Sequence, residues 1–213
     1  MKIELNKIKK SFNYKCVIKN ATFTLREGEI SVLKAPNGTG KTTVINLISG
    51  LMKQDSGTIE FEGLTQKDVC IIYGGDKNLY MKNTVNENLY YFGVLRGLTK
   101  EEISYNIQKM KPIFKSYDKL KNTLCEELSH GQKRIVSIFS SIITNNKCII
   151  LDEATEGLDQ ENIDILINLI NKIKKDVIIL IVSHDILFVN KIECKKISIK
   201  NSNIYEEGNN EIN

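Results

Sequence analysis

Apolar positions along the chain recur with two periods, which together predict an alternation of strands and helices. Residues 2–8 and 21–25 alternate apolar and polar side chains, as strands with one buried face do. Continuous apolar runs predict fully buried strands at residues 30–33, 148–151 and 177–182. Apolar residues three and four apart predict helices over residues 44–48, 135–143 and 163–173.

Residues 84–124 lack the β-branched runs of the rest of the chain, so we expect an all-helical subdomain inserted between strands. Thr99 and Glu102 form a predicted capping box that opens one helix, and Pro112 is expected to open the next. Further strands are expected at residues 58–62 and 69–73, with two closing strands within 195–206.

Length, charge and cysteine content narrow the class of protein. A chain of 213 residues can form one sizeable core with a small subdomain, but not two full domains. The net charge is +4 and lysines and glutamates are mixed along the chain, so no nucleic-acid partner is expected. The five cysteines are scattered, as in a cytosolic protein with reduced thiols. We expect a soluble chain, because no signal peptide opens it and residues 177–182 are too few to cross a bilayer.

A glycine-rich stretch, Ala35–Thr43, lies between a buried strand and a helix, which is the setting of a phosphate-binding P-loop. Gly38 and Gly40 permit backbone geometries in which successive N–H groups turn toward a phosphate. The following helix adds the positive end of its dipole. Lys41 would contact the β- and γ-phosphates and the Thr42 hydroxyl would ligate Mg²⁺. The alternative is a glycine-rich turn that binds nothing.

Candidate catalytic side chains lie where two other buried strands end. Asp152 and Glu153 close the strand at 148–151, and carboxylates at the carboxyl end of a parallel strand lie in the ligand crevice. Asp152 could hold Mg²⁺ and Glu153 could polarise an attacking water. His184 follows the strand at 177–182 and reaches the same edge. In a protein without a P-loop, two such acids would be ordinary turn residues.

Two further features each allow a structural and a functional role. Ser129 is placed as the N-cap of a helix, with Gln132 three residues on, and the amides of residues 130–132 would then form an anion-binding helix end. A serine at this position is usually only a cap. Phe12 or Tyr14 could stack on an adenine ring, or simply cover a strand edge.

These motifs together resemble the nucleotide-binding domain of ABC ATPases over nearly the whole chain. In family order they are the Walker A loop at 35–42, the signature Leu128–Gln132, the Walker B strand at 148–153, the D-loop at 157–159 and the switch histidine His184. The resemblance implies an α/β fold. It combines a P-loop NTPase core, mainly a parallel sheet flanked by helices, with an N-terminal antiparallel β subdomain and an inserted α-helical signature subdomain.

The resemblance also implies a domain plan. We expect a single ABC ATP-binding domain over residues 1–213. The ATPase core with its β subdomain would take residues 1–73 and 147–206, the helical subdomain with the signature helix residues 84–144, and a polar tail residues 207–213.

The family's site residues can be carried over by position, with ATP and Mg²⁺ as the implied cofactors. Those implied to bind ATP in one chain are Phe12, Asn37, Gly38, Thr39, Gly40, Lys41, Thr42 and Thr43. Ser129, His130 and Gly131 are implied to cap the γ-phosphate bound in a partner chain, and Gln132 and Asp159 are also implied to bind ATP. Thr42 and Asp152 would bind Mg²⁺. Glu153 would be the catalytic base, with Lys41 and His184 at the γ-phosphate.

Four positions depart from the family pattern. Ala35 stands at the first glycine of Walker A, His130 at a frequent glycine of the signature, and Ala154 at the proline common after the Walker B acids. The Q-loop glutamine is missing: Gly75 occupies its place, with Asp76 as its neighbour. In the family that glutamine links the Mg²⁺ site to the membrane partner, so coupling is expected to differ here.

The leading hypothesis is a cytoplasmic ATPase subunit of an ABC transporter. Two copies would bind head to tail on ATP and act, at the inner face of the membrane, on separately encoded integral membrane subunits. The alternative is a non-transport ABC ATPase acting on nucleic acid, ribosomes or protein assembly. A third hypothesis is a scaffold that binds nucleotide without hydrolysing it, against which the intact pair Asp152 and Glu153 argues.

Overall fold

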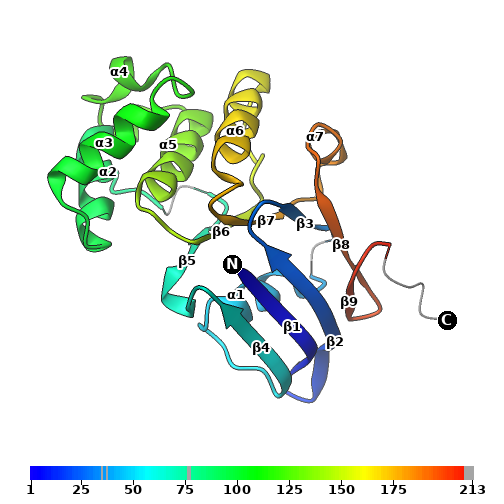
Figure 1. Cartoon of the computed structure of the whole chain (residues 1–213). Helices are drawn as coiled ribbons and strands as arrows, with labels where there is room; N and C mark the ends of the chain where they lie inside the picture. The colour runs from blue at the N-terminus through cyan, green and yellow to red at the C-terminus, as the bar shows by residue number, and fades with distance from the viewer. Residues whose placement is uncertain (35, 37, 76–77, 209–213) are drawn as a thin grey trace. The chain divides into compact units, whose positions relative to one another are not determined.

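The computed structural model describes residues 1–34, 36, 38–75 and 78–208, which form two compact units (Figure 1). The first, here called the sheet unit, comprises Met1–Ile71, Lys147–Ala154 and the described residues from Lys174 onward. The second, the helical unit, comprises Ile72–Asn146 and Thr155–Ile173. None of the helices in the described part of the chain is long and apolar enough to span a membrane.

A nine-stranded mixed sheet forms the frame of the sheet unit, in the order β4-β1-β2-β9-β8-β3-β7-β6-β5. Its strands are β1 (Lys2–Phe12), β2 (Lys15–Arg26), β3 (Ile30–Lys34), β4 (Ser56–Glu62), β5 (Val69–Ile72), β6 (Cys148–Asp152), β7 (Ile178–Val182), β8 (Lys195–Lys200) and β9 (Asn203–Glu206). The helices of this unit are α1 (Lys41–Ile48), η1 (Gln66–Asp68) and α7 (Ile186–Val189).

The direction of pairing changes across the sheet. β1 pairs antiparallel with β2 and β4, whereas β3 pairs parallel with both β7 and β8, and β6 pairs parallel with β7. Among these parallel strands, β3, β6 and β7 are the continuous apolar runs of the sequence, because a strand covered on both faces has no polar side. This arrangement confirms the predicted fold class.

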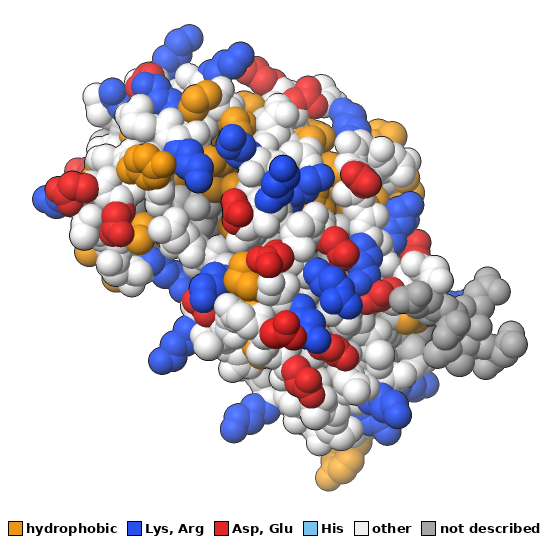
Figure 2. All heavy atoms as spheres, viewed as in Figure 1, with side chains coloured by type: hydrophobic (Ala, Val, Ile, Leu, Met, Phe, Trp, Pro, Cys, Tyr) orange, Lys and Arg blue, Asp and Glu red, His pale blue; other side chains and the backbone are white. Residues whose placement is uncertain are grey.

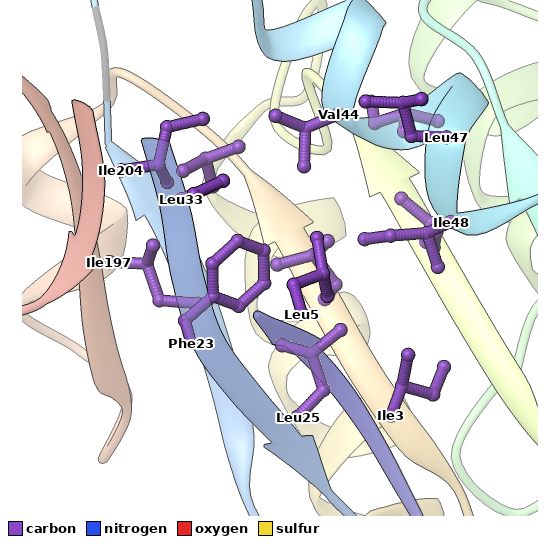
Figure 3. Close-up of a cluster of buried hydrophobic side chains, with 14 of the residues drawn as sticks. Ile3, Leu5, Phe23, Leu25, Leu33, Val44, Leu47, Ile48, Ile197 and Ile204 are labelled. Carbon is purple, nitrogen blue, oxygen red and sulfur yellow. The ribbon is translucent and has the colours of Figure 1, made fainter. Parts of the chain in front are cut away.

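The main core lies between α1 and the strands of the sheet unit (Figure 3). Val44, Leu47 and Ile48 of α1 face side chains from β1, β2, β3, β8 and β9. All three are at most 1% exposed. Since each fully buried aliphatic side chain contributes about 1.5–3 kcal/mol, α1 and the turn before it are held firmly against the sheet.

The helical unit gathers α2 (Val85–Leu95), α3 (Lys100–Met110), α4 (Tyr117–Leu120), η2 (Cys125–Glu127), α5 (His130–Ile143) and α6 (Gln160–Ile173). α5 packs against α2, α3 and α6. Capping boxes open α2 at Thr84, α3 at Thr99 and α5 at Ser129, so the boxes predicted at Thr99 and Ser129 are confirmed. The unit also includes α6. The domain plan expected from the sequence counts these residues in the ATPase core, over 147–206.

One predicted helix start is wrong. Pro112 does not open a helix: residues 111–113 form a turn and α4 begins at Tyr117. Isolated turns here let Phe114 and Tyr117 both reach Phe139, with ring centroids 5.3 and 6.0 Å away, so packing overrides the proline signal.

α7 was not predicted, because four residues are too few to show a helical period. Its one sequence signal is Asp185, whose carboxylate caps the helix by accepting from the Phe188 N–H at 3.1 Å.

Candidate functional site

Three neighbouring parallel strands end in register at one edge of the sheet unit. Leu33 of β3 pairs with Val182 at the end of β7, and Val182 pairs in turn with Asp152 at the end of β6. Such carboxyl ends are where α/β sheets bind ligands. The glycine-rich turn, Glu153 and His184 therefore all leave the sheet from this edge.

The glycine-rich turn after β3 has a backbone that only glycine adopts without strain. Gly38 and Gly40 have φ values of 77° and 102°. A Cβ on Gly40 would lie 3.0 Å from a Val17 methyl carbon, so this position also has little room for a side chain. The Thr39 hydroxyl donates to the Pro36 carbonyl at 2.7 Å and tightens the turn. The predicted residues Ala35 and Asn37 lie outside the described part of the chain.

α1 begins at Lys41, immediately after this turn. Its first internal hydrogen bond joins the Val44 N–H to the Gly40 carbonyl at 3.0 Å, and Gly40 at the N-cap has no side chain to cap the helix. A helix end of this kind directs N–H groups and positive potential outward. Lys41 is 7% exposed, Thr42 is exposed and Thr43 is half-buried. Backbone amides, a lysine and hydroxyls form a donor set that fits a polyphosphate.

Asp152 ends β6, and Glu153 follows with a left-handed backbone, φ 50°. Its N–H donates to the Val182 carbonyl at 2.9 Å, so the pairing with β7 continues for one residue while the chain turns. Both acids are half-buried. The site can thus offer one carboxylate to a hard cation and a second to a proton, as Mg²⁺-dependent hydrolysis requires.

His184 is exposed, directly beyond β7. The residues around it are fixed: Ser183 is 2% exposed and its hydroxyl accepts from the Asp185 N–H at 3.1 Å. Asp185 in turn caps α7. The histidine is therefore carried on a turn that is braced on both sides.

Phe12 is the last residue of β1, not part of the connection that the sequence suggested. It is 40% exposed, and the Lys10 ammonium lies 5.4 Å from the centre of its ring. Asn13 and Tyr14 both have positive φ and form the tight turn to β2. Phe12 thus offers an exposed ring face, and its stacking role stays a prediction.

The signature turn, Leu128–Gln132, lies in the helical unit. The Ser129 hydroxyl accepts from the Gln132 N–H at 3.3 Å, and Gln132 Oε1 accepts from the Ser129 N–H at 3.0 Å. His130 is exposed, whereas Gly131 is buried. A Cβ on Gly131 would lie 2.9 Å from Asn162 Nδ2 and 3.3 Å from the Gly157 carbonyl oxygen, so a side chain here would have to displace Asn162.

The D-loop packs against this turn within the helical unit. Gly157 has a φ of 72°, and a Cβ there would approach His130 Nδ1 to 3.1 Å. Asp159 Oδ1 accepts from both the backbone N–H and the side-chain amide of Asn162, each at 2.9 Å, and so fixes the start of α6. Sequence reasoning missed Asn162, although an aspartate three residues before it is a cap signal.

The segment at the missing Q-loop glutamine also belongs to the helical unit. Gly75 has a φ of 78°, with nothing within 4 Å of where a Cβ would stand. Asn78 Nδ2 donates to the Tyr73 carbonyl at 2.8 Å, and Arg134 donates to the same oxygen. The sequence does not signal the Arg134 contact, because it joins residues 61 apart in the chain that only the fold brings together. Asp76 lies outside the described residues.

A mixed sheet with a glycine-rich turn between β3 and α1 defines a P-loop nucleotide-binding protein. The family model described as ABC transporter matches residues 18–156. The chain belongs to this family of ABC transporter ATP-binding proteins.

Individual relatives agree with this family. The ribose import ATP-binding protein RbsA of Bacillus licheniformis is 33% identical over 86% of this chain, which spans 40% of that protein's length. The energy-coupling factor transporter ATP-binding protein EcfA2 of Clostridium acetobutylicum is 30% identical over 92% of this chain and 73% of its own length. A solved structure of the ATP-binding subunit of an ABC transporter superposes with a TM-score of 0.85 at 23% identity, covering 96% of this chain and 88% of that one. That likeness supports the fold.

Proposed function

We propose that the chain is an ATP-hydrolysing subunit of an ABC transporter that dimerises head to tail on ATP and drives separate integral membrane subunits. The observation that carries the proposal is the register of β3, β7 and β6. It brings the glycine-rich turn, His184 and Glu153 to one sheet edge in a chain of this family. We also propose the domain plan of a single ABC domain over residues 1–213, with its helical signature subdomain at 84–144.

Each side chain at this edge has a proposed task. Lys41 and the amides of the turn bind the β- and γ-phosphates of ATP, and Phe12 stacks on the adenine. Thr42 and Asp152 hold Mg²⁺, which when bound neutralises phosphate charge. The Glu153 carboxylate accepts the proton of the attacking water. His184 donates to the γ-phosphate, where charge increases during transfer.

The helical unit supplies the other half of a composite site. Ser129, His130, Gly131, Gln132 and Asp159 are proposed to contact the ATP of a second chain. The amides at the start of α5 suit this task, because a helix N-terminus attracts anions. A site divided in this way makes hydrolysis depend on dimerisation.

Membrane partners are proposed from the relatives, whose names place them in ribose import and in energy-coupling factor transport. Through such partners the chain would bind the cytoplasmic face of a membrane. On the face in view, Figure 2 shows basic and acidic side chains interspersed and no continuous basic stripe. A continuous basic stripe is the usual footprint of a nucleic-acid partner, and the face in view does not carry one.

Two measurements test the proposal. Steady-state ATP turnover with Mg²⁺ should fall at least ~100-fold in Glu153→Gln, since a general base contributes 10²–10⁴-fold, and stay unchanged in Glu161→Gln, an exposed acid on α6. Equal turnover in the wild type and Glu153→Gln would contradict hydrolysis at this site. Copurification should recover an integral membrane protein; stimulation of turnover by nucleic acid would instead support the alternative.

A further inference from the structure

Arg134 is a buried arginine of α5 within the helical unit, 4% exposed, five residues after the signature serine Ser129. It donates through an NH group to the carbonyl oxygen of Tyr73. A guanidinium keeps its charge in every protein environment, so burying one is costly unless its hydrogen bonds are satisfied. The contact satisfies one of the guanidinium donors and joins the signature helix to the residue just after β5.

The Tyr73 carbonyl is held from a second side. Asn78 Nδ2 donates to it at 2.8 Å and lies 3.4 Å from the Gly75 carbonyl. A carbonyl oxygen has two acceptor positions, and these two side chains can fill both. The strand-end segment Tyr73–Gly75, where the family carries its Q-loop glutamine, is thus tied to α5 through its backbone.

A second attachment lies on the other side of the signature turn. The Cys125 N–H donates to the Asn83 carbonyl at 2.9 Å, and the Glu126 N–H donates to the Met81 carbonyl at 3.0 Å. The Lys82 ammonium and the Glu126 carboxylate are 2.6 Å apart. The segment Met81–Asn83 is therefore joined to η2, which runs directly into Leu128.

Asn88 makes this second attachment rigid. Its side chain is fully buried; Oδ1 accepts from the Tyr80 N–H at 2.8 Å, and Nδ2 donates to the Tyr80 carbonyl at 3.0 Å and the Thr84 carbonyl at 3.0 Å. A buried amide satisfied in this way fixes the backbone around it.

We propose that Arg134 is a positioning residue that, together with the Met81–Asn83 attachment, clamps the signature turn to the segments flanking the Gly75 position. The turn is bracketed by one anchor before it and one after it, so it moves with these segments as one body. Any displacement of the Tyr73–Gly75 segment would then reach Ser129 through α5 without a glutamine. The functional meaning of this clamp rests on the proposed function, since the signature acts only on the ATP of a second chain.

The test is hydrogen exchange at single-amide resolution on the full chain with Arg134→Met, which keeps the aliphatic stem and removes the donors. The amides of Gln132 and Lys133, in the first turn of α5, should exchange roughly tenfold faster or more, the effect of losing a charge-assisted hydrogen bond. The Ile103 amide, bonded to Thr99 in α3, should change less than about twofold and reports on general loosening of the unit.

Two further variants sharpen the result. Arg134→Lys retains a donor, so its Gln132 and Lys133 amides should exchange at a rate between those of the wild type and Arg134→Met. Lys109→Met removes an exposed charge on α3, and its Gln132 and Lys133 amides should exchange as fast as those of the wild type. Wild-type rates at Gln132 in Arg134→Met would overturn the clamp. An equal acceleration at Ile103 would do the same, since Arg134 would then only stabilise the whole unit.

A second readout separates the clamp from the proposed function. In a Glu153→Gln background, ATP-driven dimerisation should weaken at least about tenfold with Arg134→Met, whereas binding of a fluorescent ATP analogue to the monomer should stay within about twofold. Failure of the parent Glu153→Gln chain to dimerise would overturn the proposed function, and the exchange experiment would still decide the clamp.

Discussion

At the scale of single residues, the candidate site depends on backbone conformations that few residues adopt. Gly38 and Gly40 lie at positive φ in the glycine-rich turn, and Glu153 does so without being a glycine. A strained residue of this kind costs of order 1–3 kcal/mol and persists only where its surroundings hold it. The bond from the Glu153 N–H to Val182 is one such restraint.

Replacing Gly40 should separate the stability of this turn from its binding role. Gly40→Ala places a methyl group at φ 102°, 3.0 Å from Val17. We expect a loss of ~1–2 kcal/mol in the free energy of unfolding and at least tenfold weaker ATP binding. Gly28→Ala is the control, because Gly28 also has a positive φ but has nothing within 4 Å. It should lose similar stability and bind ATP normally; weakened binding in both variants would contradict a specific role for Gly40.

The cysteines should differ sharply in reactivity. Burial raises the pKa of the Cys148 thiol far above its usual range, so almost no thiolate is present at neutral pH. Burial also raises the pKa of Cys125, whereas Cys16 is exposed. In the native protein a maleimide should label Cys16 first and Cys148 last, as read by peptide mass spectrometry. Early labelling of Cys148 would show that β6 is not in the core.

At the scale of elements, sequence patterns predict the strands and long helices because burial imposes a visible period. The apolar runs at 30–33, 148–151 and 177–182 correspond to β3, β6 and β7. The register of these strands determines which residues leave the sheet at the candidate site. Short elements such as α7 have no room for a period. Contacts such as Arg134 with Tyr73 join residues 61 apart in the chain, and a pattern of neighbouring residues carries no information about them.

The helix caps allow an element-scale prediction. Thr99 opens α3 and Ser129 opens α5 with the same capping box. Alanine at either position should cost about 1 kcal/mol in stability, since one helix N–H loses its acceptor. Only Ser129→Ala should also lower ATP turnover, by at least tenfold, because its hydroxyl is proposed to contact the ATP of a second chain. Equal turnover in the two variants would mean that Ser129 is a cap and nothing more.

At the scale of the whole molecule, one carboxylate makes the stability of the sheet unit depend on pH. It belongs to Asp55, which bonds residues 45 and 44 positions away in the chain. Asp55 accepts from the Lys10 ammonium and from the Ser11 N–H, both at 2.7 Å, and these bonds lower its pKa below the usual 3.8. A lowered folded-state pKa contributes stability that is present above pH 3.8 and is lost as the pH falls through the folded value.

Denaturant unfolding at several pH values should show this link. Asp55→Asn should be less stable than the wild type at neutral pH, and the difference should shrink as the solution is acidified below pH 3.8. Glu193→Gln, which alters an exposed acid of the same unit, is the control. A difference between Asp55→Asn and the wild type that stays constant over this range would show that Asp55 acts by packing alone.

The central claim is that each ATP site needs two chains, and a mixing experiment tests it most directly. Lys41→Ala removes the lysine proposed to bind phosphate and Ser129→Arg blocks the proposed signature contact, so each variant alone should be inactive. A mixed dimer has one intact site, made of the glycine-rich turn of one chain and the signature of the other. In an equal mixture half the dimers are mixed, so turnover should return to about a quarter of the wild-type rate if the sites act independently. No recovery on mixing, or full activity of Ser129→Arg alone, would contradict a composite site.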